Sequence, residues 1–199
     1  KDWDYERLRN IADKIGATFM QQDVTDEERW KEIIKETVNI HGKLDVLVNN
    51  AGIVEVGDPE NQTTEEYRKT MAVHMDSTFF GCKFSIPVMT ESGGGSIVNM
   101  CSIASVQGES YVAAYCAAKG AIEAYTRAVA VHCGLKKNGV RCNSIHPSGI
   151  ITPRFKVFLK RWKQNLEEHQ IKTRQQVNRE SLMISLMQLY TLLQTSQNS

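Results

Sequence analysis

The sequence predicts an α/β fold, in which helices alternate with the strands of a doubly wound parallel sheet. Short strand-like segments at 44–49, 96–100 and 140–145 alternate with longer helical patterns. The first of them, Leu-Asp-Val-Leu-Val-Asn, is nearly continuously apolar, as a buried parallel strand should be. Small or polar residues follow each segment, at the sheet edge where ligands bind in such folds. The 199 residues are enough for one domain with a real core.

The elements follow from periodicity and from capping residues. Helical patterns occupy 5–15, about 26–40, 63–89 and 115–134, and a fourth strand is predicted at 17–22. Thr25 or Asp26 is a suitable N-cap for the second helix, and Gly42 is its expected C-cap. Thr63 and Glu66 form a capping-box pattern at the start of the third helix, which we expect to end near Pro87.

Bulk composition excludes several classes of function. The net charge is +1 and the pI about 7.8, so neither nucleic acid nor a membrane is an expected partner. The N-terminus is not a signal peptide and lacks Met, so we expect the chain to begin within a longer protein or to be processed. The five cysteines form no C-x-x-C pair, which favours reduced, mostly buried thiols, a cytoplasmic location and no bound metal. Cys101 is interpreted as one of these buried thiols rather than as a reactive one.

A hydroxyl, a phenol and an ammonium group suggest redox chemistry on alcohols. Ser102 follows a strand, and Tyr115 and Lys119 lie one helical turn apart on one helix face. A cation beside Tyr115 would lower the pKa of its phenol, which could then exchange a proton with an alcohol or carbonyl oxygen. Y-x-x-x-K also arises by chance as a pair of residues on a helix with no catalytic role. The remaining motifs must decide between a catalytic pair and a chance pair.

A second cluster of small residues follows the strand at 44–49. Asn49-Asn50-Ala51-Gly52 would let a ligand approach the backbone closely, although an ordinary Asn/Gly turn is the alternative.

Together these residues resemble the short-chain dehydrogenase/reductase family. Asn49-Asn50-Ala51-Gly52 is similar to the family's N-N-A-G motif. Ser102, Tyr115 and Lys119 are similar to its Ser and Y-x-x-x-K. The segment 143–153 is similar to its N-x-I-x-P-G-x-x-x-T-P segment. The resemblance covers roughly residues 5–153. Its closest similarity is to the bacterial hydroxysteroid dehydrogenase branch, through Ser-Ile-His-Pro-Ser-Gly-Ile and Phe-Phe-Gly-Cys. It implies an incomplete Rossmann-type sheet, without the first strands and the last one.

The resemblance also implies roles for individual residues. Tyr115 would be the general acid/base, Lys119 would lower its pKa and bind the nicotinamide ribose, and Ser102 would hold the substrate oxygen. The expected contacts with the cofactor, NAD or alternatively NADP, are Asp23, Val24, Asn49, Ala51, Gly52, Tyr115, Lys119, Pro147, Ile150 and Thr152. The substrate would be a small apolar alcohol or ketone. The helices at 63–89 and 115–134 would form the interface of a homo-oligomer.

The sequence departs from the family pattern in three places. The phosphate-binding T-G-x-x-x-G-x-G turn does not occur in residues 1–199, so we expect poor cofactor affinity for the chain as given. His74 stands where the family has a fourth catalytic residue, an Asn that acts largely through its backbone carbonyl. His74 is interpreted as a tolerated replacement, or as a substitute in that catalytic role. Ser148 replaces the usual Gly after Pro147, which is a mild change.

Residues 156–199 form an atypical tail, which we expect to be helical or disordered. It lacks Gly, Ala, Asp and Pro and shows none of the family's C-terminal motifs. Reading its codons one base earlier forces an Asp codon across Met183 and Ile184 and an Ala codon across Met187 and Gln188. With allowed synonymous codons, the stretch from Ser181 then reads E-P-D-D-I-A-N-A-V-V-Y-L-A-S-D-E-S-K-F, the segment expected of the family. The hypothesis is that the tail is a frameshift product.

Two functions remain open at this point. The first is an NAD(P)-dependent oxidoreductase that interconverts a secondary alcohol, such as a hydroxysteroid, and its ketone. The second is a truncated and inactive fragment that acts at most as a dimerising or interaction protein. The absence of the glycine turn from this sequence is the feature that separates them.

Overall fold

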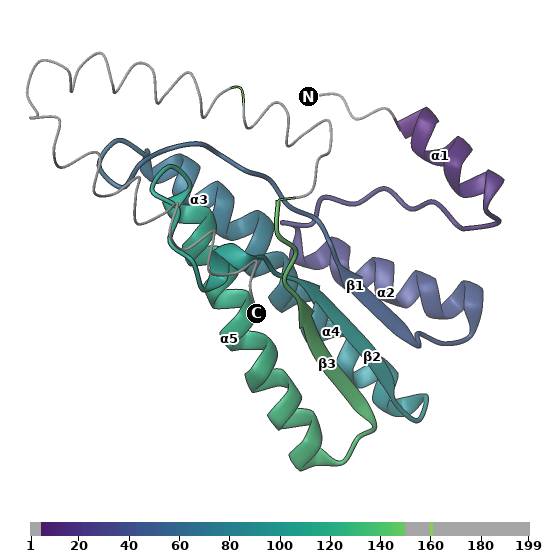
Figure 1. Ribbon diagram of the computed structural model, residues 1–199. Coiled ribbons are helices and arrows are strands. Elements are labelled where there is room, and N and C mark those ends of the chain that lie inside the picture. The colour runs from purple at the N-terminus through teal and green to yellow at the C-terminus, as the bar shows by residue number, and fades with distance from the viewer. Residues whose placement is uncertain (1–4, 150–159, 161–199) are drawn as a thin grey trace, which may run out of the picture. The chain divides into compact units, whose positions relative to one another are not determined.

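The computed structural model describes residues 5–149 and Lys160 (Figure 1). Along the chain its elements are α1 (Tyr5–Lys14), α2 (Glu27–His41), β1 (Val46–Asn49), α3 (Thr64–Met71), the π-helical turn η1 (Ala72–Asp76), α4 (Ser77–Glu91), β2 (Gly95–Met100), the 3₁₀ turn η2 (Ile103–Ser105), α5 (Ala113–Lys136) and β3 (Val140–Ile145). The expectations for Ile150, Thr152 and the tail at 156–199 fall outside the described residues, apart from Lys160.

The three strands form the predicted parallel sheet, in the order β1-β2-β3. Asn49 of β1 is level with Asn99 of β2, which is level with Ser144 of β3. Helices α4 and α5 pack against one face of the sheet (Figure 1). On the opposite face, the side chains of Val46, Val48 and Ile145 remain 50–54% exposed. The described helices therefore cover mainly one face, although the strand pattern allows for two.

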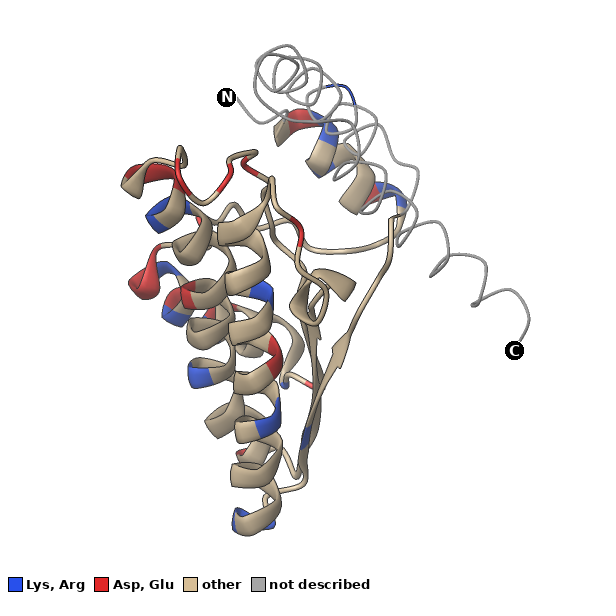
Figure 2. Cartoon of the chain, turned by 60° about the vertical axis from the view of Figure 1, so that its left-hand side comes forward, with Lys and Arg blue, Asp and Glu red and all other residues tan. Residues whose placement is uncertain are grey.

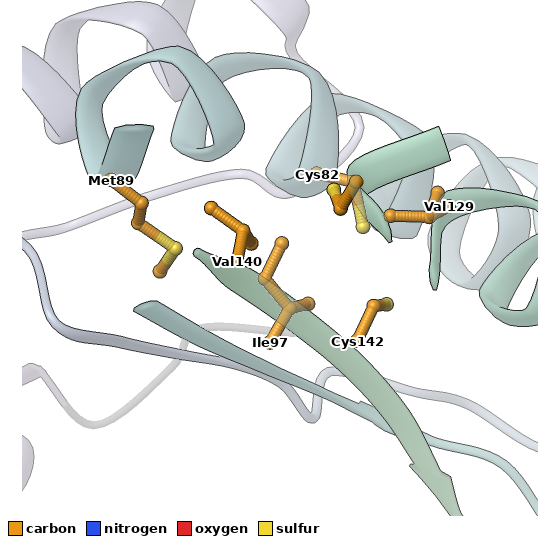
Figure 3. Close-up of a cluster of buried hydrophobic side chains, with 7 residues drawn as sticks. Cys82, Met89, Ile97, Val129, Val140 and Cys142 are labelled. Carbon is orange, nitrogen blue, oxygen red and sulfur yellow. The ribbon is translucent and has the colours of Figure 1, made fainter. Parts of the chain in front are cut away.

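The hydrophobic core lies between the sheet and the helices α4 and α5 (Figure 3). Its buried members are drawn from both layers: Cys82, Met89, Ile97, Val129, Cys133, Val140 and Cys142. Three of these residues are cysteines, and all five cysteines of the chain are free. This confirms the interpretation of the cysteines as mostly buried thiols.

The helix ends confirm the predicted caps. The Asp26 carboxylate accepts a hydrogen bond from the Arg29 amide, and Gly42 closes α2 in the left-handed conformation, with φ of 80°. The Thr63 hydroxyl accepts from the Glu66 amide while the Glu66 carboxylate accepts from the Thr63 amide, which completes the capping box. These local signals are readable in sequence because each involves residues only three or four positions apart.

Two predicted elements require correction. Residues 17–22 do not form a strand, because no strand in the described part of the chain pairs with them and side chains of α2 bind the neighbouring carbonyls. Arg29 Nε donates to the Gln21 carbonyl at 3.0 Å, and Trp30 Nε1 to that of Val24 at 2.8 Å. The single helix expected at 63–89 is divided by η1 into α3 and α4. Its predicted end is confirmed, because α4 ends at Glu91 and Pro87 lies close to that end.

Charge is unevenly distributed over the long helices. Apart from His132, the titratable and charged side chains of α5 are Tyr115, Cys116, Lys119, Glu123, Tyr125, Arg127, Cys133 and Lys136. Figure 2 shows long stretches of this helix free of acidic and basic colour.

Among the described residues, no helix combines the length and the apolar character needed to cross a membrane.

Candidate active site

A buried amide network fixes the ends of β1 and β2. Asn49 Nδ2 donates to Asn99 Oδ1 at 2.8 Å, and Asn99 Nδ2 donates to the Thr126 hydroxyl at 2.9 Å. Asn49 is 8% exposed and Asn99 is fully buried. A Cβ at position 81 would lie 2.4 Å from Asn49 Oδ1. The helix α4 can therefore lie this close to the sheet only because residue 81 is a glycine. The Asn49 side chain therefore faces the helices, and the predicted cofactor contact at Asn49 stays a prediction for its backbone.

The loop after β1 brings Gly52 against His74. A Cβ built on Gly52 would lie 2.7 Å from His74 Cε1, which leaves no room for a side chain. His74 Nε2 lies 2.7 Å from the Ile53 carbonyl oxygen and 3.2 Å from the Ile53 amide nitrogen. Ala51, just before this contact, is exposed. The predicted approach of a ligand to the backbone at Ala51 is thus sterically open, while the His74 ring packs against Gly52 from the protein side.

His74 lies in the π-helical turn and packs against Tyr115. Its ring is 1% exposed and meets the Tyr115 ring edge-on, with centroids 5.3 Å apart and planes at 83°. Its carbonyl oxygen accepts hydrogen bonds from the Thr78 hydroxyl at 2.8 Å and the Ser77 hydroxyl at 3.3 Å. π-Helical turns occur often at functional sites. The structure thus brings His74 to the predicted catalytic residues.

Ser102, Tyr115 and Lys119 come together at the carboxyl edge of β2. The Ser102 hydroxyl is hydrogen-bonded to the Tyr115 phenol. Lys119 Nζ lies 5.5 Å from the centre of the Tyr115 ring, over its face, as the i, i+4 spacing predicts. The ammonium also donates to the Met100 carbonyl at 2.6 Å. Lys119 is only 4% exposed, so it is a buried cation held by one backbone oxygen and one aromatic face.

The pKa of Tyr115 corrects one expectation. Burial raises it above its ordinary value, and the hydrogen bond from Ser102 opposes that rise. The expected lowering by Lys119 is wrong for this structure, because burial is the larger effect on the pKa of Tyr115 and the Lys119 ammonium donates to the Met100 carbonyl. Burial also lowers the pKa of Lys119 to about 8. The trio is assembled, but the pKa of its phenol is raised rather than lowered.

The remaining predicted contacts within the described residues are Asp23, Val24 and Pro147. The Asp23 carboxylate accepts from the amide and the hydroxyl of Thr25, at 2.9 and 2.8 Å, and these hydrogen bonds lower its pKa. The Val24 carbonyl accepts a hydrogen bond from the Trp30 indole. Pro147 accepts a hydrogen bond from the Ile103 amide at 3.1 Å, which ties the loop after β3 to the loop carrying Ser102.

Sequence reasoning missed the groups that support the trio. The Met100 carbonyl, which holds Lys119, carries no side-chain signal at all. The roles of Asn99 and Thr126 were also missed, although polar residues at buried positions of a predicted strand and helix are a usable signal.

Comparison with known proteins shows the family of this chain. The family model described as enoyl-(acyl carrier protein) reductase matches residues 2–186, well over half of the chain. The chain belongs to the short-chain dehydrogenase/reductase family. It is similar to an NADP-dependent (R)-specific alcohol dehydrogenase from Lentilactobacillus kefiri, at 40% identity over 71% of this chain and 58% of the relative. It is also similar to a 3-beta-hydroxysteroid dehydrogenase from Comamonas testosteroni, at 38% identity over 76% of this chain and 60% of the relative.

A solved structure agrees with the sequence relatives. ElxO with NADP bound superimposes with a TM-score of 0.72 and 31% identity, over 79% of this chain and 64% of that one. The chain therefore spans about three fifths of the length of the short-chain dehydrogenase/reductase relatives it matches. The parallel sheet and the alternation of helices and strands predicted from sequence are those of this family.

Proposed function

We propose that the chain provides the proton-transfer half of an NAD(P)-dependent oxidoreductase that interconverts a secondary alcohol and its ketone. The observation that supports this most directly is the contact of three groups at one sheet edge. Ser102 is hydrogen-bonded to Tyr115, and the Lys119 ammonium lies 5.5 Å from the centre of the same ring. A positioned phenol and hydroxyl are what transfer of a hydroxyl proton requires.

Each residue has a separate part in the proposed reaction. In the oxidative direction, Ser102 orients the substrate hydroxyl by a hydrogen bond, and Tyr115 accepts its proton. The cofactor, when bound, supplies the hydride acceptor. Because Tyr115 has a raised pKa here, a cation must come closer to its oxygen before it can act as a base near neutrality. Lys119 is the nearby candidate, and its movement from the Met100 carbonyl toward a ribose hydroxyl would bring that charge closer.

The residues present suit the nicotinamide end of the cofactor. Gly52, backed by His74, and the exposed Ala51 leave backbone open to close approach at the same edge as Tyr115. His74 would act as a positioning residue, because its ring supports both the Gly52 loop and Tyr115. Asp23 would lie at the adenine end, as an ionised acceptor held by Thr25. NAD and NADP are both compatible with this set, and the relatives named above favour NADP.

The proposed substrate is an apolar secondary alcohol such as a 3-hydroxysteroid. The support is the similarity to a 3-beta-hydroxysteroid dehydrogenase. We further propose a homo-oligomer that pairs through α4 and α5. Phe79, Val131 and Leu135 on these helices are 39%, 62% and 81% exposed, which is high for large apolar side chains.

The decisive experiment measures cofactor binding and turnover in two proteins. One is the 199-residue chain, and the other carries an N-terminal extension that supplies the family's glycine turn and first strands. We expect NAD(P)H fluorescence to show binding in the extended protein, with oxidation of a 3-hydroxysteroid. Tyr115→Phe should lower kcat by roughly 10²–10⁴ and weaken NAD(P)H binding far less. An extended protein that binds NADPH and turns over no secondary alcohol, or a Tyr115→Phe variant as active as its parent, would contradict the proposal.

A further inference from the structure

Three side chains with metal-binding chemistry meet behind the proton-transfer site. Cys101 follows β2, Glu123 lies on α5, and His146 follows β3. One ligand atom from each, a sulfur, a carboxylate oxygen and an imidazole nitrogen, lies within 4.8 Å of the other two. These residues are 22 or more positions apart in the chain, so only the fold brings them together.

Cys101 supplies the buried and rigid side of this cluster. It is 4% exposed, and its Sγ donates a hydrogen bond to the Lys119 carbonyl oxygen at 3.1 Å. Glu123 lies one helical turn beyond Lys119 on α5. The thiol therefore comes from the end of β2, and the carboxylate comes from α5. Glu123 Oε1 pairs with Arg127 Nη1 at 2.5 Å. A carboxylate has a second oxygen, which can serve a cation while Arg127 keeps the first.

His146 is oriented from both sides of its ring. Its Nε2 lies 2.8 Å from the Ser144 hydroxyl, and its Nδ1 lies 3.2 Å from the Ser105 hydroxyl. Ser105 is also hydrogen-bonded to Glu123, so this hydroxyl stands between the imidazole and the carboxylate. Nδ1 also lies 3.3 Å from the Ser102 carbonyl oxygen, which can only accept, so in the metal-free chain Nδ1 carries the ring proton. A cation bound at Nδ1 would require the other tautomer, in which Nε2 carries the proton and donates it to Ser144. A ligating histidine held by a hydrogen bond at its other nitrogen is the usual arrangement in metal sites.

We propose that Cys101, Glu123 and His146 bind a divalent cation of the zinc type. A thiolate, a carboxylate and a neutral imidazole together carry two negative charges, which balance one divalent cation. Sulfur with nitrogen and oxygen suits Zn²⁺ and Co²⁺ rather than Mg²⁺ or Ca²⁺, which prefer oxygen alone. Ligand atoms around tetrahedral zinc lie about 3.5 Å apart, so the cluster must contract. His146 is exposed and Glu123 half-buried, so their side chains can move while Cys101 stays fixed. Water would fill the fourth position.

The test is a Co²⁺ titration of the chelator-treated 199-residue chain, kept reduced. We expect a thiolate-to-cobalt charge-transfer band and the strong visible bands of four-coordinate Co²⁺, saturating at a single equivalent and abolished by Zn²⁺. Cys101→Ser should remove the charge-transfer band. Glu123→Gln and His146→Asn should each weaken Co²⁺ binding by at least about tenfold, and Ser144→Ala by about tenfold through the loss of its hydrogen bond to the ring.

The matched controls are Cys116→Ser, a partly exposed thiol outside the cluster, and His132→Asn, an exposed histidine on the same helix. Both should leave the Co²⁺ spectrum unchanged. The proposal is overturned if the parent chain gives no charge-transfer band, or if the band survives in Cys101→Ser and so arises from other thiols. It is also overturned if Glu123→Gln and His146→Asn bind Co²⁺ as tightly as the parent. These two changes lie near the surface, so the proposal stays testable even if Cys101→Ser fails to fold.

Discussion

The imidazole of His74 meets the ring of Tyr115 edge-on, at a centroid distance of 5.3 Å and an angle of 83°. The same imidazole fills the space where a Cβ of Gly52 would lie. One buried side chain thus connects the loop after β1 with the phenol on α5. Changes at Gly52 and at His74 should therefore not act independently.

The first prediction concerns this coupling. Gly52→Ala should lower the free energy of unfolding by roughly 1–3 kcal/mol, because the added methyl group overlaps the His74 ring. In a His74→Ala background, the same change should cost less than about 1 kcal/mol. Chemical denaturation of the four proteins in this double-mutant cycle gives the coupling energy. Additive costs would show that the overlap is relieved in some other way.

The second prediction concerns the pKa of Tyr115. The hydrogen bond from Ser102 lowers that pKa, against the larger effect of burial, so Ser102→Ala should raise it further. The measurement is an ultraviolet titration of phenolate, read as the difference between each protein and its Tyr115→Phe counterpart. This subtraction removes the other tyrosines, including Tyr125, whose pKa burial raises to about 12. An unchanged or lower pKa in Ser102→Ala would contradict the assigned hydrogen bond.

The third prediction concerns the stability of the fold against pH. Burial lowers the pKa of Lys119 from 10.5 to about 8. Between these values the unfolded chain holds a proton that the folded chain has released, so the free energy of unfolding should rise with pH. Relative to Lys119→Met, the parent should gain roughly 3 kcal/mol across this window. Denaturation in metal-free buffer from pH 7 to pH 10 should show most of this rise. A parent and variant with parallel curves would mean that Lys119 is not buried as a cation.

The fourth prediction concerns the buried amides. Asn99→Ala should lower the free energy of unfolding by about 2–5 kcal/mol, because both Asn49 and Thr126 lose their buried partner. Asn49→Ala should cost less, since only one hydrogen bond to Asn99 is lost and Asn49 Oδ1 has no hydrogen-bond partner among the described residues. Urea denaturation of the two variants tests the order. Equal costs would argue against Asn99 as the centre of the network.

The fifth prediction concerns the tail at 156–199. If it is a frameshift product, genomic DNA and transcript should show a single-base change upstream of Ser181 that restores the family's C-terminal segment. Independent reads that preserve the present frame, with codons incompatible with the overlapping reading, would exclude the idea.

Sequence reasoning succeeded where function depends on spacing within one element or on residues next to a strand end. Tyr115 and Lys119 are four positions apart on one helix, and Ser102 follows a strand, so their proximity was predictable. Spacing does not show which way a side chain points. Asn49 belongs to the N-N-A-G motif, and only the structure shows that its side chain points into the helix layer.

The remaining misses have physical causes that no local pattern carries. Residues 17–22 have the composition of a strand but no ladder partner in the described part of the chain. Lys119 donates to a backbone carbonyl, so its effect on Tyr115 could not be judged from spacing. Cys101, Glu123 and His146 share no motif, and their meeting depends on strand order and on the path of the loop after β3.

The hydrogen bond between Asn49 and Asn99 has a consequence for the alignment of the two strands. These residues are opposite each other in the parallel register. A slip of one residue would turn one amide to the other face of the sheet and leave its partner buried without a hydrogen bond. Gly52 follows Asn49 by three residues, and Ser102 follows Asn99 by three residues. The pairing of two amides deep in the fold thus sets the relative height of the two loops on which the proposed chemistry depends.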